Sequence, residues 1–289
     1  MKLAYYPGCS LHSTAIDYDE SARAVADTLN IELVEVPDWT CCGASPAHFT
    51  NTILSLSLPI KNLQSAEKIS KQMVVFCAAC YSRYKFAEKS LEENPQRKEK
   101  IKEILNIGSI PDVKTRHFLD ILMNEIGLEK IQGQIKQDLN GLKVACYYGC
   151  LLTRPPDITE FDDPEQPSSL DNLVKILGAE PISWAYKNEC CGGSLGLSRT
   201  DIVVKLTYDI LLTASEAGAE CLVVACPLCQ ANLELRQEDI NKKFKKNFSI
   251  PILYFTQLLG LALGVDIKSL GLHRAVVGNE SLLRNKGIT

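Results

Sequence analysis

The sequence lacks a long cluster of basic residues, although 31 of its 289 residues are Lys or Arg. A nucleic acid is therefore not expected as a partner. The N-terminal stretch MKLAYYPGCS also lacks the apolar run of a signal peptide, so we expect a cytoplasmic protein. The length suggests about two domains. An apolar content of 46% is ordinary for a globular protein.

One uncharged stretch, FSIPILYFTQLLGLALGV at 248–265, reaches the lower limit of length for a membrane span. Polar or helix-breaking residues interrupt it, among them Pro251 and Gln257. Residues 250–262 also align with a charged segment at 110–122. We therefore predict a buried strand followed by a helix, and no direct membrane span.

Cysteine, by contrast, is abundant. In a cytoplasmic chain of this size, disulfides are a poor explanation for many cysteines, and metal or redox chemistry is a better one. The 12 cysteines are Cys9, Cys41, Cys42, Cys77, Cys80, Cys146, Cys150, Cys190, Cys191, Cys221, Cys226 and Cys229.

Most of these cysteines belong to two sets of five that share one order. The first set is Cys9-x31-Cys41-Cys42-x34-Cys77-x2-Cys80. The second set is Cys150-x39-Cys190-Cys191-x34-Cys226-x2-Cys229. Cys146 and Cys221 align instead with Tyr5 and Gln72, outside the pattern, so we predict buried, inert thiols at both positions.

The segments around the cysteines also repeat. Short apolar runs at 3–11 and 73–80 match those at 144–152 and 222–229, and each run ends at a cysteine or within two residues of one. Apolar residues with helical spacing lie between these runs: Ala22, Val25, Ala26 and Leu29 in the first half, and Val203, Leu206 and Ile210 in the second. A further helix is expected at 168–178, which starts with a Ser cap and ends in Gly.

This alternation predicts two repeated α/β units with mainly parallel sheets, related by internal pseudo-symmetry. The polar segment 136–143 contains an Asn-Gly turn and suggests a boundary between residues 1–140 and 141–289. Ligands of α/β proteins usually bind at the carboxyl ends of the strands. We therefore expect each cysteine set to converge at one edge of its sheet.

Several metal or redox sites are possible for five cysteines. A structural zinc ion takes four tetrahedral ligands, and a cubane iron–sulfur cluster takes four thiolates. A thioredoxin-like disulfide would use only the two C-x-x-C pairs. A larger or opened iron–sulfur cluster fits better, because adjacent cysteines can bind different irons or one sulfur can bridge two. Gly43 and Gly192 follow the adjacent pairs, where the backbone must turn tightly.

The motifs resemble those of the cysteine-rich CCG domain family. YYPGCSLHSTAIDYDES, CCGASPAH, CYYGCLLTRPPD and VACPLCQANL are especially similar to the B subunits of heterodisulfide reductases from methanogens and related anaerobes. This resemblance covers nearly the whole chain. Relatives also occur in glycolate, lactate and succinate oxidoreductases, often with incomplete cysteine sets, whereas both sets are complete here.

The resemblance implies an iron–sulfur oxidoreductase with two non-cubane [4Fe-4S] clusters and no catalytic side chain beyond their ligands. The ligands implied by position are Cys9, Cys41, Cys42, Cys77 and Cys80 for one cluster, and Cys150, Cys190, Cys191, Cys226 and Cys229 for the other. The implied reaction is reduction of the coenzyme M–coenzyme B heterodisulfide to two thiols, a reaction of methanogenesis, between the two clusters. Two clusters suit a disulfide, because each can take one sulfur and supply one electron.

Two other functions remain open. The chain is alternatively an electron-relay subunit of a hydroxy-acid or succinate oxidoreductase, or a zinc-stabilised scaffold without enzymatic activity. The sequence has no flavin fingerprint and no ferredoxin-type C-x2-C-x2-C run, so it cannot collect electrons from a nicotinamide alone. The resemblance implies a complex with the ferredoxin-like C and flavin-containing A polypeptides of heterodisulfide reductase. A hydrogenase or a formate dehydrogenase is a further candidate partner.

The anionic ends of the implied substrate need cationic or amide donors. Candidates near the cysteines are Arg83, Arg154, Lys187, Arg199, His12 and His48, although each is also explained as a solvated or salt-bridged surface residue. His117 is expected to pack or to cap a helix aligned at Gln257, and His273 in the tail carries little information. The Pro- and Asp-rich insertion 153–169 is predicted to be a loop, serving as a lid, a partner contact or a passive insertion.

Overall fold

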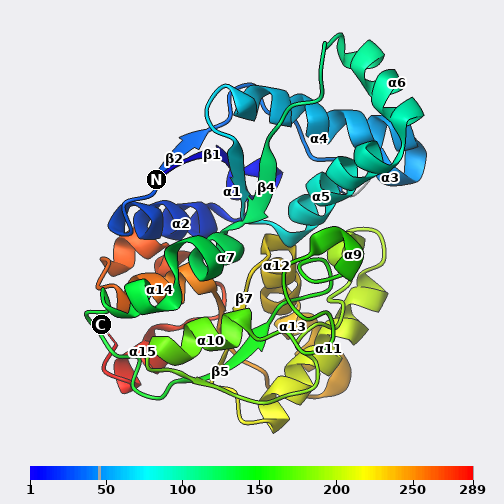
Figure 1. Cartoon of the computed structure of the whole chain (residues 1–289). Coiled ribbons are helices and arrows are strands. Elements are labelled where there is room, and N and C mark those ends of the chain that lie inside the picture. The colour runs from blue at the N-terminus through cyan, green and yellow to red at the C-terminus, as the bar shows by residue number, and fades with distance from the viewer. Residues whose placement is uncertain (45–46, 289) are drawn as a thin grey trace.

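The computed structural model describes residues 1–44 and 47–288, and each half of the chain contains one four-stranded parallel sheet (Figure 1). The first sheet has the order β2-β1-β3-β4, and the second has the order β6-β5-β7-β8. Every strand pair is parallel, so the predicted pair of α/β units is confirmed. The boundary at residue 140 stays a prediction. The strands are β1 Lys2–Tyr6, β2 Glu32–Glu35, β3 Gln72–Val75, β4 Lys114–His117, β5 Lys143–Tyr147, β6 Glu180–Pro181, β7 Cys221–Val224 and β8 Ile252–Tyr254.

Helices connect the strands and cover the sheets, as the apolar periodicity predicts. The first half contains α1 Gly8–Leu11, α2 Ile16–Thr28, α3 Ala47–Thr50, α4 Thr52–Glu67, α5 Ala78–Glu93, α6 Pro95–Leu105, α7 Phe118–Ile121, the π-helix η1 Leu122–Ile126 and α8 Leu128–Gln132. The second half contains α9 Pro156–Thr159, α10 Ser169–Ile176, the 3₁₀-helix η2 Gly193–Gly196, α11 Thr200–Glu216, α12 Pro227–Leu235, α13 Gln237–Phe244 and α14 Phe255–Ala262. The tail adds the 3₁₀-helices η3 Ile267–Leu270 and η4 Leu272–Arg274, and then α15 Glu280–Asn285.

The start of α10 lies where the sequence predicts it, but its cap has a different chemistry. The Ser168 side chain makes no capping hydrogen bond. Instead, the hydroxyl of Tyr148 accepts hydrogen bonds from the backbone N–H groups of Leu170 and Asp171, at 2.8 and 3.1 Å. The first N–H groups of a helix need an acceptor, and here a tyrosine from the end of β5 supplies it. Ser168 therefore occupies the predicted N-cap position, but its side chain does not cap the helix.

The stretch 248–265 contains β8 and α14, as predicted, and both are buried. Among the described residues, no helix has the length and apolar character that a membrane crossing requires. The alignment of this stretch with 110–122 is shifted by three residues. His117 pairs with Val75 of β3, and Tyr254 pairs with Val224 of β7, so His117 corresponds to Tyr254 and not to Gln257.

The two halves pack against each other through helices α2 and α14, which lie side by side (Figure 1). The rings of Tyr18 and Tyr254 stack with their centroids 3.9 Å apart, and the hydroxyls of Ser21 and Thr256 lie 2.7 Å apart. These contacts bury apolar surface from both halves, so the relative position of the two sheet edges is fixed by packing.

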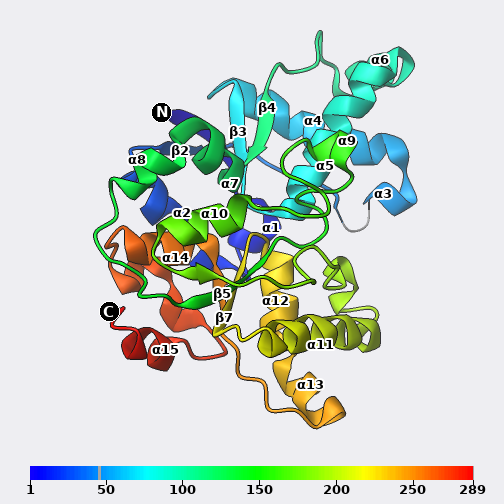
Figure 2. The same cartoon turned by 60° about the horizontal axis from the view of Figure 1, so that its bottom comes forward.

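The insertion 153–169 contributes a second contact between the halves. Its helix α9 packs against α5 of the first half (Figure 1, Figure 2). The hydroxyl of Tyr81 donates to the carbonyl of Thr159 at 2.6 Å, and the ammonium of Lys89 donates to the carbonyl of Asp157 at 2.5 Å. The insertion therefore also holds the second half against the first, a role in addition to the lid, partner contact or passive insertion that the sequence leaves open.

Candidate functional site

The cysteines of both sets lie just beyond the carboxyl ends of the strands. Cys9 follows β1 on α1, and Cys77 follows β3 as the residue before α5. In the second half Cys150 follows β5, and Cys226 precedes α12 after β7. In each sheet the strand order reverses between the two central strands, β1 and β3 or β5 and β7, and open α/β sheets bind ligands at such a point. The predicted convergence at the sheet edge is thus present.

The first set of thiols forms a continuous group. The Sγ atoms of Cys42 and Cys80 lie 3.1 Å apart, and the backbone N–H of Gly43 donates to the Sγ of Cys41 at 3.4 Å. Hydrogen bonds from Cys42 and Cys9 hold the pKa of Cys41 well below its usual range. The bond to Cys41 correspondingly raises the pKa of Cys42 to about 12. The group therefore favours one thiolate at Cys41 with protonated neighbours.

The second set repeats the contacts of the first but not its pattern of pKa shifts, because hydrogen bonds from neighbouring thiols also lower the pKa values of Cys191 and Cys226. The Sγ atoms of Cys191 and Cys229 lie 3.6 Å apart, and the backbone N–H of Gly192 donates to the Sγ of Cys190 at 3.3 Å. A hydrogen bond from Cys150 lowers the pKa of Cys190 to about 6. In each set, the first cysteine of the adjacent pair thus accepts from the cysteine at the end of the first strand, and its pKa is lowered. A thiolate is the form that binds metal.

The two sets also meet each other. The Sγ atoms of Cys77 and Cys226 lie 4.0 Å apart across the contact between the halves. The Nε2 atom of His117 lies 3.1 Å from the carbonyl oxygens of both Phe76 and Ala225, the residues that precede these cysteines. Its Nδ1 accepts from the backbone N–H of Leu119, so the expected capping role of His117 is confirmed. One buried imidazole therefore links the strand ends that present the two sets.

Glycine is required after each adjacent cysteine pair. Gly43 has φ +76°, and a Cβ built there would lie 2.8 Å from the Cβ of Ala47. Gly192 has φ +91°, and its Cβ would lie 2.8 Å from Cγ2 of Val203. L-residues with a side chain rarely adopt these φ values. The tight turn expected from the sequence is confirmed at both positions. Residues 45 and 46 of the CCGASPAH motif lie outside the described residues.

The thiols of neither set surround a single point among the described residues. Within 1–44 and 47–288, no three His, Cys, Asp or Glu side chains converge as ligands of a single metal ion. Cys146 and Cys221 lie apart from both sets, on β5 and β7, where they are fully buried. Burial raises the pKa of both thiols, to about 12 for Cys221. The predicted burial is confirmed, and the predicted inertness stays a prediction.

A cavity of about 390 Å³ opens onto the first set of thiols. Its opposite wall comes from η2 and α12 of the second half, so the cavity lies between the halves. The cysteines of the second set do not line it. Most of the lining is apolar, including Leu151, Leu197, Leu228 and Leu235. The sequence suggests a cleft between two clusters, whereas this cavity is lined by the first thiol set alone, and Cys190 of the second set is exposed without lining it.

Arg236 is a polar residue of this cavity that is absent from the candidates drawn from the sequence. Its Nη2 donates to the carbonyl of Gly196 at 2.7 Å, and its Nη1 lies 3.4 Å from a carboxylate oxygen of Asp239. Its Nε is buried and has no partner among the described residues. Cys229, Asn232 and Arg236 are spaced i, i+3 and i+7, which places them on one face of a helix. That spacing is the signal in the sequence that could have identified Arg236.

Asn232, on the same face, supports the wall of the cavity. Its side-chain amide donates to the carbonyl oxygens of Cys191 and Gly193, at 3.2 Å each. It also lies 3.6 Å from the Sγ of Cys191. Asn232 therefore links the second thiol set to the η2 segment that borders the cavity.

The cationic candidates from the sequence lie elsewhere. Arg154 is held within the insertion by Pro164 and Glu165, Lys187 pairs with Asp171, and Arg199 pairs with Asp201. His12 pairs with Glu35, and His48 packs against the ring of Phe49. Arg83 lies over the ring of Phe86 and near Cys42. The cavity lining thus includes none of these six.

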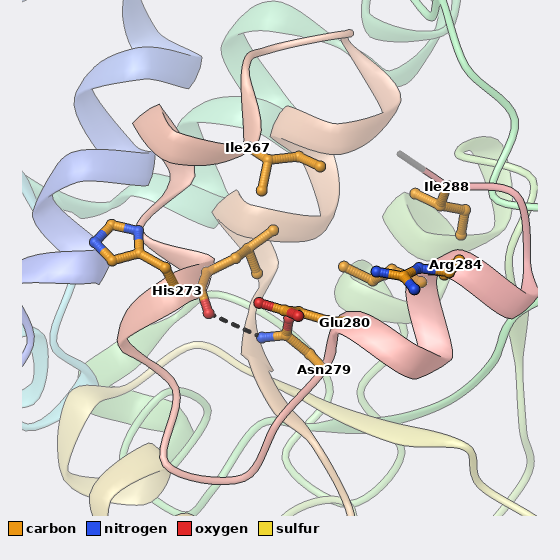
Figure 3. Close-up of a pocket in the computed structure, with 8 residues that line it drawn as sticks. Ile267, His273, Asn279, Glu280, Arg284 and Ile288 are labelled. Carbon is orange, nitrogen blue, oxygen red and sulfur yellow. Dashed lines mark hydrogen bonds between the residues drawn. The ribbon is translucent and has the colours of Figure 1, made fainter.

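A second cavity of about 320 Å³ lies in the C-terminal tail, and it is lined by His273 and Arg284 among others (Figure 3). Asn279 at this cavity donates to the backbone carbonyl of Leu272 at 3.2 Å. No cysteine lines this cavity. It is therefore separate from the thiol sets, and His273 has no place in the candidate site.

A comparison with known protein families finds one family twice in this chain, once in each half. The family model described as a cysteine-rich domain, CCG, matches residues 3–85 and 144–234. The chain is 33% identical over 277 residues to the 8-methylmenaquinol:fumarate reductase membrane anchor subunit of Wolinella succinogenes, covering 96% of this chain and 97% of that one. It is 30% identical over 291 residues to the B subunit of the ferredoxin:CoB-CoM heterodisulfide reductase of Methanosarcina mazei, covering 98% and 96%.

Among solved structures, a hypothetical protein from Helicobacter pylori aligns with a TM-score of 0.75 at 13% identity. The alignment covers 96% of this chain and 52% of that one. At this identity the likeness shows the fold alone. The resemblance seen in the cysteine motifs, including the likeness to heterodisulfide reductase B subunits, is confirmed by the sequence comparisons.

Proposed function

Because this chain belongs to the cysteine-rich CCG domain family, we propose that it is the disulfide-reducing subunit of a multi-subunit reductase. The proposed substrate is the mixed disulfide of coenzyme M and coenzyme B. Three relatives named as heterodisulfide reductase B subunits, or as similar to them, are 30%, 29% and 30% identical over most of this chain. They support a redox subunit of this type, and the substrate is our inference from their names.

The donor set fits iron–sulfur clusters. Each set supplies five thiols that include an adjacent pair, and sulfur ligands favour iron–sulfur clusters and other soft metal sites. We assign Cys9, Cys41, Cys42, Cys77 and Cys80 to one non-cubane [4Fe-4S] cluster, and Cys150, Cys190, Cys191, Cys226 and Cys229 to the other. When bound, the clusters supply single electrons and iron sites for sulfur. Cys41 and Cys190, whose pKa values are lowered, are thiols that readily become thiolate ligands.

The cavity between the halves is the observation that carries the proposal. It brings a substrate-sized space against the first thiol set, and no cysteine of the second set lines it. Its leucine side chains suit the alkyl arms of a disulfide and exclude water from the reacting sulfur atoms. The guanidinium of Arg236, at the wall, is placed to bind a sulfonate, phosphate or carboxylate at the end of such an arm.

A second function is favoured by one finding. The relative at 33% identity is named as a subunit of a fumarate reductase. In this alternative the chain relays electrons to or from another subunit, and the cavity does not bind a disulfide. The two functions differ in whether the chain with its clusters turns over the disulfide when electrons come from an artificial donor.

The proposed partners follow from the same relatives. A ferredoxin-like C polypeptide and a flavin-containing A polypeptide would deliver electrons, with a hydrogenase or a formate dehydrogenase as a further donor. A reductase of several subunits is supported by the names of these relatives, each of which is described as one subunit. The individual partners are part of the proposal.

The test uses the anaerobically purified complex, a reduced viologen as electron donor and the coenzyme disulfide as substrate. Breaking the disulfide to two thiols takes two electrons and two protons. Cys42→Ala should disrupt the cluster of the first set and Cys191→Ala that of the second, each with loss of about half of the iron if each set binds one four-iron cluster. Both variants should lose nearly all disulfide reduction. Cleavage between two clusters requires that the disulfide also reach the second set, which does not line the cavity. If Cys191→Ala, or Cys42→Ala, keeps substantial activity after loss of its cluster, cleavage between two clusters is wrong. If the intact complex reduces no disulfide, the relay function is favoured, and zinc without iron would indicate a scaffold.

A further inference from the structure

Two tyrosines lie at the junction of the thiol sets. Tyr18 from α2 and Tyr254 from the end of β8 stack face to face, with ring centroids 3.9 Å apart and an angle of 7° between the rings. Both side chains are fully buried. They belong to different halves, and the contact between α2 and α14 holds them beside each other (Figure 1).

Neither tyrosine hydroxyl has a hydrogen-bond partner, sulfur atoms included, among the described residues, and they are the two tyrosines among several buried side chains of which this is true. Other buried tyrosines of the chain do have one: Tyr147 donates to the carbonyl of Glu189, and Tyr148 donates to Asp171, each at 2.6 Å. Buried polar groups in native proteins are nearly always paired. Two unpaired hydroxyls on stacked rings therefore point to an acceptor that the protein chain does not provide.

The surroundings indicate which acceptor this is. Burial raises the pKa of Tyr18, and the neighbouring thiols of Cys226 and Cys77 raise it further. Burial also raises the pKa of Tyr254, with Cys226 again among the neighbouring groups. Both hydroxyls therefore stay protonated and can act as hydrogen-bond donors. Tyr18 packs edge-on against Phe76, the residue before Cys77, and Tyr254 is paired in register with Val224, two residues before Cys226.

The arrangement is not symmetric between the halves. The counterpart of Tyr254 in the first half is His117, whose Nε2 already lies at hydrogen-bond distance from two carbonyl oxygens. Helix α10, the counterpart of α2, has the sequence SLDNLVKI and contains no tyrosine. The two unpaired hydroxyls thus have no equivalents in the repeat. Hydrogen bonds to cluster sulfur atoms tune reduction potentials, so an asymmetric pair of donors gives two otherwise similar centres different potentials.

We propose that Tyr18 and Tyr254 donate hydrogen bonds to the sulfur atoms of the iron–sulfur group held by Cys226 and Cys229. These bonds stabilise the more negative, reduced form and hold its potential above that of the group held by the first set. The inference rests on the proposed function only in requiring that both sets bind iron–sulfur clusters. An electron that reaches the pair of centres would then reside mainly on the second one, behind the cavity wall.

The test compares Tyr18→Phe and Tyr254→Phe in the complete complex, because phenylalanine keeps the stacked ring and removes only the hydroxyl. Potentiometric titration followed by electron paramagnetic resonance should show one cluster potential shifted to a more negative value in each variant and the other unchanged. Tyr148→Phe is the control, because its hydroxyl already has a partner, Asp171. Unchanged potentials in both tyrosine variants, with full iron content, would overturn the inference.

A second measurement covers the case in which a variant loses its cluster. Wild-type complex exchanged into deuterium oxide should show shifted iron–sulfur stretching frequencies in resonance Raman spectra, as expected for hydrogen bonds to cluster sulfur. The absence of any such shift would also overturn the inference. Neither measurement uses the disulfide substrate. A complex with shifted potentials but no disulfide turnover therefore refutes the proposed function and leaves this inference standing.

Discussion

Replacement of Gly192 by alanine tests why a glycine follows the adjacent cysteines. Gly192 has φ +91°, and a non-glycine residue in a left-handed conformation costs about 1–2 kcal/mol. The new Cβ would lie 2.8 Å from Cγ2 and 3.3 Å from Cα of Val203, and overpacking of this kind costs about 1–3 kcal/mol. Alanine also reduces the conformational entropy of the unfolded chain, which offsets the destabilisation by up to about 1 kcal/mol. We therefore expect Gly192→Ala to lower the free energy of unfolding by about 1–5 kcal/mol, with about 3 kcal/mol at the centre of that range.

The neighbouring glycine provides a matched control. Gly193 also has a positive φ, +41°, but a Cβ there would have no atom within 4 Å. Gly193→Ala should therefore lower the free energy of unfolding only through its left-handed backbone conformation, by about 1 kcal/mol. Val203→Ala removes the Cγ2 atom that the new methyl group meets. Gly192→Ala should therefore lower the free energy of unfolding less in the Val203→Ala background than in the wild type, and a double-mutant cycle measures this difference.

The assay is urea unfolding of the anaerobically purified protein, followed by circular dichroism, together with an iron determination. Because Gly192 orients Cys190 and Cys191, its replacement should also reduce iron bound by the second set, and Gly193→Ala should not. The reasoning is refuted if Gly192→Ala and Gly193→Ala have equal free energies of unfolding, or if Val203→Ala and Gly192→Ala show no coupling.

Three further predictions use other parts of the chain. Cys146→Ala and Cys221→Ala should each keep the full iron content, and loss of iron from a folded variant would show that the ligand assignment is wrong. Arg236→Gln should raise KM for the disulfide at least tenfold with a smaller change in kcat, since a hydrogen bond to a charged group is worth about 1.5–3 kcal/mol. The control is Arg199→Gln, which should change neither constant because the guanidinium of Arg199 pairs with Asp201 at the surface. An unchanged KM in Arg236→Gln would exclude anion binding at Arg236. Burial raises the pKa of Glu88 above its unfolded value, so its contribution to stability is present at acid pH and is lost as pH rises through the folded pKa. Glu88→Gln should therefore gain stability relative to wild type as the pH rises from the unfolded pKa of a glutamate, about 4.3, to neutrality in thermal melts, and a constant difference across that range would contradict the assigned cause.

Much of the fold could be predicted from the sequence, because its signals are local. Strands and helices follow from the spacing of apolar residues, and the two cysteine patterns reveal the repeat before any coordinates. The details that failed depend on distant contacts. The N–H groups of α10 are capped by Tyr148 from another element instead of Ser168. The three-residue shift that makes His117 correspond to Tyr254 is fixed by strand pairing, which apolar composition does not specify.

Some features of the candidate site likewise follow from the sequence, and others only from the tertiary structure. The order and spacing of the cysteines, with glycine after each adjacent pair, determine two thiol sets at the carboxyl ends of parallel strands. Which set a substrate can reach is decided only in the tertiary structure, because exposure of a thiol depends on how the two halves pack. That packing brings Cys77 to 4.0 Å from Cys226, places Arg236 at a cavity beside the first set, and buries Tyr18 against Tyr254. Each of these contacts joins residues far apart in the chain, so no local pattern in the sequence encodes it.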